Sequence, residues 1–390
     1  ATPPGKPSII TTTSLTNDAT PTIEGVAEAG STVNLYNDTQ SGTYAVTVES
    51  KTSEHTYVGT GSSLGYKIDG VFSPFLTFTP GNTFRFDQSD SSNTNHPLRF
   101  YLEADRSNLY STGVITNGTP GQAGAYTEIT ISDTTPSELY FQCTSHGYMG
   151  DAAYTSLGTT TADGTTGAYT ITPAELSDGA YALTVTATDT AGNTSSASSA
   201  LNITVDTTAP GQPSITTTTT LTSDATPTIE GTAEADSTVT LLSGGVAIAT
   251  TTANGDGQFS ITTSTLADSN YALTVTATDA AGNTSAASSA LSITVDTTAP
   301  SKPSITTTTS LTNDSTPAIE GVAEAGSTVK LFNGSTELGS ITADGTTGAY
   351  SIAPTAALDD GAYALTVTAT DEAGNTSAAS DALSITVDAT

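Results

Sequence analysis

The chain has 390 residues, and its 39 acidic and 8 basic side chains give a formal net charge of −31. This balance excludes nucleic acid and anionic membrane surfaces as partners, because both bind through basic patches. It fits solubility in salty surroundings, or carboxylates that await a hard cation such as Ca²⁺. The single cysteine cannot form an internal disulfide, and no apolar run approaches the roughly 18 residues of a membrane-spanning helix.

The two ends of the chain read as cuts through a longer polypeptide. It opens on ATPPGKPSI, a proline-rich linker rather than the basic and apolar stretch of a signal peptide, and it closes on ITVDAT. The length predicts two to four domains.

An internal repeat organises most of the sequence. The segment PSIITTTSLTNDATPTIEGVAEAGSTVNL at 7–35 returns with few changes at 213–241 and 303–331. A closing half that begins YALTVTATD stands at 181–206, 271–296 and 363–388. The second and third repeats start roughly 90 residues apart and the first two roughly 206 apart, so repeat one carries about 116 extra residues.

The insertion point lies in a hairpin of the first repeat. Repeat one has STVNLYND at 31–38 and resumes as SLGTTTADGTTGAY from Ser156, whereas repeat three runs through without a break. Loop tips tolerate insertions because their ends are close in space. We therefore predict a discontinuous first domain (1–38 with 156–206), an inserted domain (39–155), a second repeat domain (207–296) and a third (297–390).

Each repeat predicts a two-sheet β-sandwich. Runs such as ALTVTATD and LSITVD alternate with period two, and Gly, Asn, Asp and Pro punctuate them every eight to twelve residues. Roughly seven such strands in about 90 residues fit a sandwich of the immunoglobulin type. Without Trp or a disulfide, we expect aliphatic burial alone to hold it.

These repeats resemble a known family. The linker ITVDTTAP and the motifs TPTIEGTAEADSTV and TATDAAGNTS are similar to the tandem bacterial immunoglobulin-like repeats of giant biofilm-type surface adhesins, including those exported with an RTX segment. The resemblance implies an extracellular, monomeric rod on a bacterial cell surface. It also implies that the rod presents a module to a polysaccharide or protein ligand.

The insert contains a constellation of metal-ligand residues. It holds all three histidines, the cysteine and the methionine of the chain, arranged as His96…Cys143-x-x-His146-x-x-Met149. Strands are expected within 75–100 and 126–150, so that the cysteine ends a strand and the first histidine follows another. Two imidazoles and a thiolate in a plane, with a weak axial thioether, form the ligand set of a blue-copper centre.

The insert accordingly resembles the cupredoxins, which are Greek-key β-sandwiches or barrels. The loop CTSHGYM has the amicyanin-type spacing, and FTPGNTFRF and LYFQC are similar to the strands before each ligand. Cupredoxins commonly have Asn after the first His; here Pro97 takes that place, and Asn93 or Asn95 is a candidate substitute. A rival interpretation keeps the fold without the metal, with Cys143 and Met149 only packing in the core.

The junctions between repeats are predicted calcium sites. In an immunoglobulin-like topology the loops at facing poles bring acidic and amide side chains together, and six oxygen ligands suit Ca²⁺. At the first junction these are Asp18, Asp178, Asp206, Glu234, Asp279 and Asn283; at the second they are Asp224, Asp268, Asp296, Glu324, Asp371 and Asn375. The alternative is that Asp and Asn recur there because turns favour them.

The sequence indicates a non-catalytic protein. Three histidines leave little room for acid–base chemistry, His55 has no evident partner, and GTGSSLG at 59–65 lacks the following helix of a phosphate site. The leading interpretation is an adhesin fragment, a Ca²⁺-stiffened rod presenting a cupredoxin-like module with one copper ion. The alternatives are an extracellular electron-transfer module, and a purely structural extender with a metal-free insert.

Overall fold

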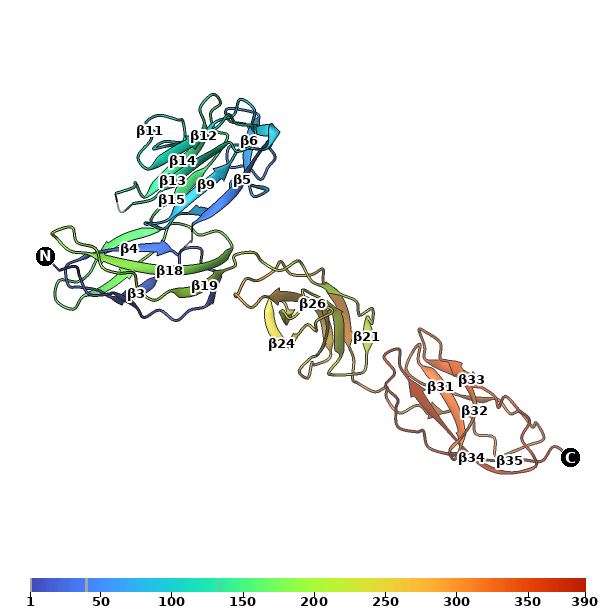
Figure 1. Cartoon of the computed structure of the whole chain (residues 1–390). Helices are drawn as coiled ribbons and strands as arrows, with labels where there is room; N and C mark the ends of the chain where they lie inside the picture. Colours follow the sequence, from blue (N-terminus) through green and yellow to red (C-terminus); the bar gives the residue numbers. More distant parts are fainter. Residues whose placement is uncertain (1, 39–40, 133) are drawn as a thin grey trace. The chain divides into compact units, whose positions relative to one another are not determined.

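The computed structural model describes residues 2–38, 41–132 and 134–390 (Figure 1). The predicted insert boundary at residue 39 therefore lies outside the described residues. The chain forms two compact units, Ala1–Thr208 and Ala209–Thr390. The described residues are strands and loops, apart from the short 3₁₀ turn η1 (Ser91–Asn93), and none of their helices could cross a membrane. The predicted all-β class is confirmed.

The first repeat is a sandwich of two sheets in the first unit. One sheet has the order β1 (Ser8–Ile9), β3 (Ile23–Val26), β17 (Ala168–Ile171). The other has the order β16 (Gly158–Thr161), β4 (Thr32–Asn37), β18 (Gly179–Thr188), β19 (Leu201–Val205), β2 (Leu15–Thr16). Along β18 the buried residues Leu183, Val185 and Ala187 alternate with threonines that cover the outer face, as a half-buried strand requires.

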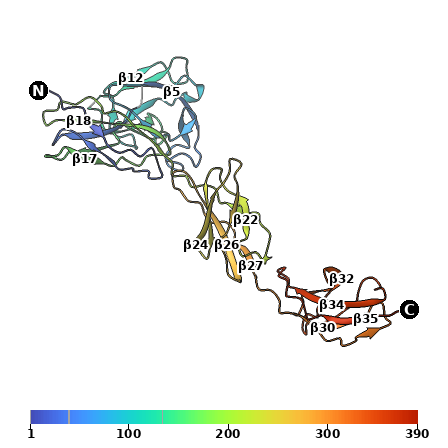
Figure 2. The same ribbon diagram turned by 90° about the horizontal axis from the view of Figure 1, so that it is seen from below.

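The second unit repeats this arrangement twice. In the second repeat the sheets are β20 (Ser214–Ile215), β22 (Thr228–Thr232), β25 (Gln258–Thr262), and β21 (Leu221–Thr222), β27 (Leu291–Val295), β26 (Ser269–Thr278), β23 (Thr238–Ser243), β24 (Val246–Thr252). Figure 2 shows β22, β24, β26 and β27 within one sandwich. In the third they are β28 (Ser304–Ile305), β30 (Ile319–Val322), β33 (Ala349–Ile352), and β29 (Leu311–Thr312), β35 (Leu383–Val387), β34 (Gly361–Thr370), β31 (Thr328–Asn333), β32 (Thr336–Thr342).

The expectation that aliphatic side chains alone hold the repeats is wrong. An aromatic ring is buried at the same position of every repeat, as Tyr169, Phe259 and Tyr350. Each ring covers a strand glycine, Gly25, Gly231 or Gly321, where a Cβ would overlap the ring. The two tyrosines also donate hydrogen bonds of 2.8 Å to the backbone oxygens of Ser8 and Ser304. The ring replaces the packing that a glycine in a strand lacks.

The extra residues of repeat one form a separate sandwich between β4 and β16. One sheet has the order β11 (Leu109–Tyr110), β10 (Leu98–Tyr101), β14 (Glu138–Cys143), β15 (Ala152–Tyr154), β8 (Leu76–Thr77). The other has the order β12 (Val114–Asn117), β13 (Tyr126–Thr130), β9 (Thr83–Asp87), β5 (Gly42–Ser50), β6 (Leu64–Ile68), β7 (Val71–Phe72). β4 still pairs with β16, Leu35 opposite Gly158, as β23 pairs with β24 in the second repeat. The sandwich thus takes the place of a hairpin turn.

The core of this inserted sandwich is aromatic. Phe86 is fully buried, and its ring centroid lies 5.2 Å from that of Tyr44, 5.5 Å from Phe100 and 6.3 Å from Phe141. Cys143 and Met149 belong to the same buried cluster. Burial of rings in both sheets gives the sandwich a core of its own.

Side chains of both sandwiches meet within the first unit. The Asn37 amide donates a 3.0 Å hydrogen bond to Thr77 Oγ1, and Thr79 Oγ1 donates to the Asn37 carbonyl at 2.7 Å. Phe75 stacks on Tyr154 at 5.1 Å and meets the edge of Tyr181 of β18 at 6.1 Å. Polar and aromatic contacts therefore connect the insert to the repeat that carries it.

Candidate metal centre

His96, Cys143 and His146 converge at one end of the inserted sandwich. Cys143 is the last residue of β14, and His146 lies on the loop that follows. Leu98 of β10 pairs with Cys143, which brings the loop containing His96 alongside. Cys143 Sγ lies 3.8 Å from His96 Nδ1 and 3.5 Å from His146 Nδ1. Within the part of the chain that the structure describes, this is the group of three donors at metal-ligand spacing.

The donor distances fit a bound metal ion. An ion at about 2.3 Å from sulfur and about 2.0 Å from nitrogen separates the two donors by roughly 3.5 Å in a tetrahedral and roughly 3.7 Å in a trigonal arrangement. The two observed sulfur–nitrogen distances, 3.5 and 3.8 Å, lie at these values. Soft thiolate with two imidazoles is also a donor set that suits copper. The residues therefore fit the ion that the spacing predicted.

Hydrogen bonds to its backbone carbonyl hold Met149 in place. Its side chain is fully buried in the cluster that contains Cys143. Its carbonyl oxygen accepts a 2.6 Å hydrogen bond from the Tyr66 N–H of β6 and a 3.0 Å bond from His55 Nε2. The structure thus places the fourth predicted ligand in the same buried cluster as Cys143.

His55 supports the ligand loop. The Tyr57 N–H donates to His55 Nδ1 at 3.0 Å, so a neutral ring carries its proton on Nε2 and donates to the Met149 carbonyl. Burial lowers the pKa of His55, which keeps the ring neutral. Gly65 of β6 leaves room for this ring, because a Cβ there would overlap it. This role could not be predicted from the sequence, because no motif near His55 indicates a contact with Met149, which lies 94 residues away.

Two buried side chains hold the backbone of His96. The Tyr66 hydroxyl donates to the His96 carbonyl at 2.8 Å, and Gln88 Nε2 donates to the same oxygen at 2.9 Å. Gln88 Oε1 accepts from the Leu98 N–H at 3.1 Å, which anchors the start of β10. Burial, followed by the neighbouring Cys143, raises the pKa of Tyr66 well above its ordinary value, so its hydroxyl remains a donor.

The two histidines predicted as ligands differ in exposure. His96 is buried at 9% exposure, whereas His146 on the loop is much more exposed. Their ring centroids lie 4.7 Å apart at 42°. Burial, followed by the charge of His146, lowers the pKa of His96, which favours the neutral imidazole that binds metals.

The side chain of Asn93, one of the two candidate substitutes for the missing asparagine, does not join the ligand loops. Asn93 Nδ2 donates to the Val46 carbonyl of β5 at 2.7 Å and to the Asp90 carbonyl at 3.2 Å. The backbone joins the loops instead, because the Thr144 N–H donates to the Pro97 carbonyl at 3.0 Å. At the end of the loop that follows Cys143, the Gly150 N–H donates a 3.0 Å hydrogen bond to Gln142 Oε1 of β14.

The predicted calcium ligands on the loops before each linker bind the linker itself. One oxygen of Asp178 accepts from the Thr207 N–H and hydroxyl, both at 2.7 Å, and the other accepts from the Thr208 hydroxyl at 2.5 Å. Asp268 repeats this arrangement with Thr297 and Thr298. These bonds lower the pKa of both carboxyls, the bond from the second threonine hydroxyl most strongly. Asp206 and Asp296 each accept from the backbone two residues on.

The remaining predicted calcium ligands sit in turns. Asp279 and Asp371 each accept from the amide of the asparagine four residues later, Asn283 or Asn375, at 2.9 Å. The Asn375 amide also donates to the Asp296 carbonyl at 2.6 Å. Asp18 and Asp224 accept from the backbone two residues later. Glu234 and Glu324 stand in turns where their carbonyls accept from Ser237 and Ser327.

A family model described as a bacterial Ig-like domain matches residues 149–207, 212–297 and 299–389. The chain belongs to the bacterial Ig-like domain family. The three matches follow the three Ig-like repeats in order, and the first begins late, so most of the inserted sandwich lies outside them. Tandem Ig-like domains, expected from the repeat pattern, are thereby confirmed. Domains of this kind are typically structural and non-enzymatic.

Several solved structures show a distant resemblance to the chain. They include the fibronectin(III)-like modules of Clostridium thermocellum CbhA (17% identity, TM-score 0.33, 45% of this chain and 94% of that one). The BSP domain of a biofilm associated protein is 12% identical at a TM-score of 0.20, over 99% of this chain and 66% of that one. The chicken CNTN1 FN1–FN3 domains are 11% identical at 0.28, over 99% of both chains. No curated protein matches the sequence.

Proposed function

We propose that the inserted sandwich is a cupredoxin-like module that binds one copper ion through His96, Cys143, His146 and Met149. The observation that carries the proposal is the position of Cys143 Sγ between two imidazole Nδ1 atoms, at 3.5 and 3.8 Å. A thiolate and two neutral imidazoles satisfy either oxidation state of copper. Such an ion would supply one-electron redox chemistry.

The residues around the donors prepare the site. His55, Tyr66 and Gln88 fix the backbones of Met149 and His96, so that the donors converge before an ion arrives. Cys143 is fully buried, which protects a free thiol from oxidation, and the more exposed His146 is the donor with access to a partner outside. Electron transfer at His146 is the second candidate function, and it rests on this exposure.

Metal stoichiometry tests the copper proposal. Native mass spectrometry and competition with a chelator should detect one copper ion per chain. Removal of a planar donor should weaken binding more than removal of the weak axial one. We expect His96→Ala to reduce affinity more than about 100-fold and Met149→Leu to have a smaller effect. Equal affinity in wild type and His96→Ala would contradict the proposed ligand set, and absence of copper binding by the wild type would support the rival proposal, a metal-free insert that serves as a structural extender.

The Ig-like repeats are proposed to be the stalk of a bacterial surface adhesin outside the cell. Membership of the bacterial Ig-like family supports this proposal, as does the charge of −31, which disfavours nucleic acid and anionic membranes. The function would be attachment to a polysaccharide or protein, without catalysis. The division of the chain at 38/39, 155/156, 206/207 and 296/297 belongs to the same proposal, as does an RTX-type parent chain.

Calcium at the junctions between repeats is a further part of the proposal. The Asp178 and Asp268 carboxylates already accept three hydrogen bonds each from linker threonines, so a cation there must compete with them. If calcium orders the linkers, small-angle X-ray scattering should show a smaller maximum dimension once a chelator removes it. Identical scattering with and without the chelator would contradict the calcium proposal and leave the threonine bonds as the linker's support.

A further inference from the structure

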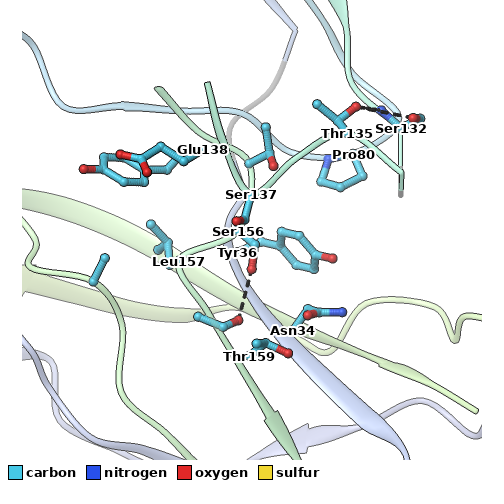
Figure 3. A pocket seen from close by; sticks show the side chains of 14 residues that line it. Asn34, Tyr36, Pro80, Ser132, Thr135, Ser137, Glu138, Ser156, Leu157 and Thr159 are labelled. Carbon is cyan, nitrogen blue, oxygen red and sulfur yellow. Dashed lines mark hydrogen bonds between the residues drawn. The ribbon is translucent and has the colours of Figure 1, made fainter. Parts of the chain in front are cut away.

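A pocket of about 380 Å³ lies between the inserted sandwich and the Ig-like repeat that carries it. Figure 3 shows Pro80, Ser132, Thr135, Ser137 and Glu138 of the insert on one wall, and Tyr36, Asn34 and Thr159 of the repeat on the other. The volume lies in the range of small-ligand sites, roughly 300–1,000 Å³. Because both sandwiches supply lining residues, the pocket exists only where the insertion occurs.

Three other hollows of the molecule are not specific to the insertion. Similar ones recur beside Ser8, Ser214 and Ser304, at the same position of all three repeats. A feature that every repeat carries follows from the repeat fold itself. The pocket beside Glu138 has no such counterpart, since the positions of Asn34 and Thr159 correspond by register to Thr240 and Thr250 in the second repeat, which has no insert.

The polar groups that line the pocket have capacity to bind a ligand. Glu138 Oε1 accepts a 2.9 Å bond from the Tyr140 hydroxyl, and Oε2 makes no hydrogen bond to the described residues. The Asn34 amide and the hydroxyls of Ser137 and Thr159 likewise bond to no described residue. A carboxylate, an amide and two hydroxyls can accept from and donate to a ligand that carries many hydroxyl groups.

The charge and the aromatic content of the pocket lining limit the kinds of ligand that could bind there. It contains no Lys, Arg or His, and Glu138 is its one charged residue, so an anionic ligand would meet only repulsion. Tyr36 and Tyr154 add aromatic surface, on which the apolar face of a sugar ring packs. Burial, followed by the charges of Glu138 and Asp151, raises the pKa of Tyr154, so its hydroxyl stays a donor.

We propose that this pocket binds a neutral oligosaccharide. The site does not depend on the metal centre, and it would give the proposed surface protein a ligand-binding position at the base of its insert. Glu138 and Asn34 would hold sugar hydroxyls, and the tyrosines would hold the ring. Discrimination against acidic sugars follows from the single carboxylate and the absence of cationic side chains in the lining.

Glycan binding by the full chain tests the proposal. An array of neutral and acidic oligosaccharides should return neutral members only, and titration calorimetry of those should show a loss of at least tenfold in affinity for Glu138→Gln and for Asn34→Ala. Thr250→Ala, at the register position of Thr159 in the repeat without an insert, should bind as wild type. Binding of acidic sugars alone, binding of none, or unchanged affinity in both pocket variants would overturn it. Glu138→Gln preserves the shape of the side chain, so its effect reports on the carboxylate rather than on folding.

Discussion

Replacement of Gly150 with alanine is expected to disrupt the metal centre and destabilise the inserted sandwich by about 3 kcal/mol or more. A Cβ at this position would overlap the carbonyl oxygen of Phe141 on β14, a backbone atom that cannot move without shifting the strand that ends at Cys143. The Gly150 N–H would also lose its hydrogen bond to Gln142 Oε1. Urea unfolding monitored by circular dichroism, together with copper affinity, measures both effects.

Gly147 provides a matched control on the same loop. A Cβ there would come no closer than 3.6 Å to Arg106 Nε, an ordinary van der Waals contact. Gly147→Ala should therefore retain wild-type stability within about 0.5 kcal/mol and bind copper normally. Equal tolerance of alanine at Gly147 and Gly150 would show that the loop does not pack on β14 as described.

Replacement of Phe86 with alanine should destabilise the insert by about 3–5 kcal/mol and leave the Ig-like repeats folded. The ring is fully buried and packs against the rings of Tyr44, Phe78, Phe100 and Phe141, so its removal leaves a cavity at the centre of the aromatic core. Hydrogen exchange measured by mass spectrometry should show faster exchange in peptides from 42–155 and unchanged exchange in 209–390.

Phe259→Ala is the reciprocal variant. Phe259 is buried at 4% exposure in the second repeat, where it covers Gly231. Its loss should accelerate exchange in the second repeat and leave copper binding intact. A global change of exchange in either variant would contradict the separate cores that the structure describes.

Most of the fold could be predicted from the sequence, because comparison of the three repeats shows where each repeating unit begins and ends. Three copies of one pattern predicted the strands, and the gap between Asp38 and Ser156 predicted an insertion between two segments that pair in the structure as β4 and β16. Residue types that bind metals, at the spacing of a known ligand set, likewise predicted that His96, Cys143 and His146 lie close together. The first inference depends on a repeated pattern, and the second on a ligand set that is rare in this chain, which has one cysteine, one methionine and three histidines.

Contacts between distant segments could not be predicted in this way. The hydrogen bond from His55 to the Met149 carbonyl spans 94 residues, and that from Tyr66 to the His96 carbonyl spans 30. Neither pair carries a local motif. The aromatic ring over each strand glycine was missed for a related reason, because Tyr169 and Gly25 are brought together only by the pairing of β17 with β3.

We propose that Cys143, His96 and His146 bind copper as one mononuclear centre. A copper titration of the reduced, metal-free protein, followed by visible absorption with Cys143→Ser as control, tests it most directly. We predict an intense charge-transfer band that rises to one equivalent and is absent from the variant, because the transition requires a copper–thiolate bond. A wild-type protein that stays colourless while its thiol remains reduced would contradict the claim and leave the donor cluster as packing alone.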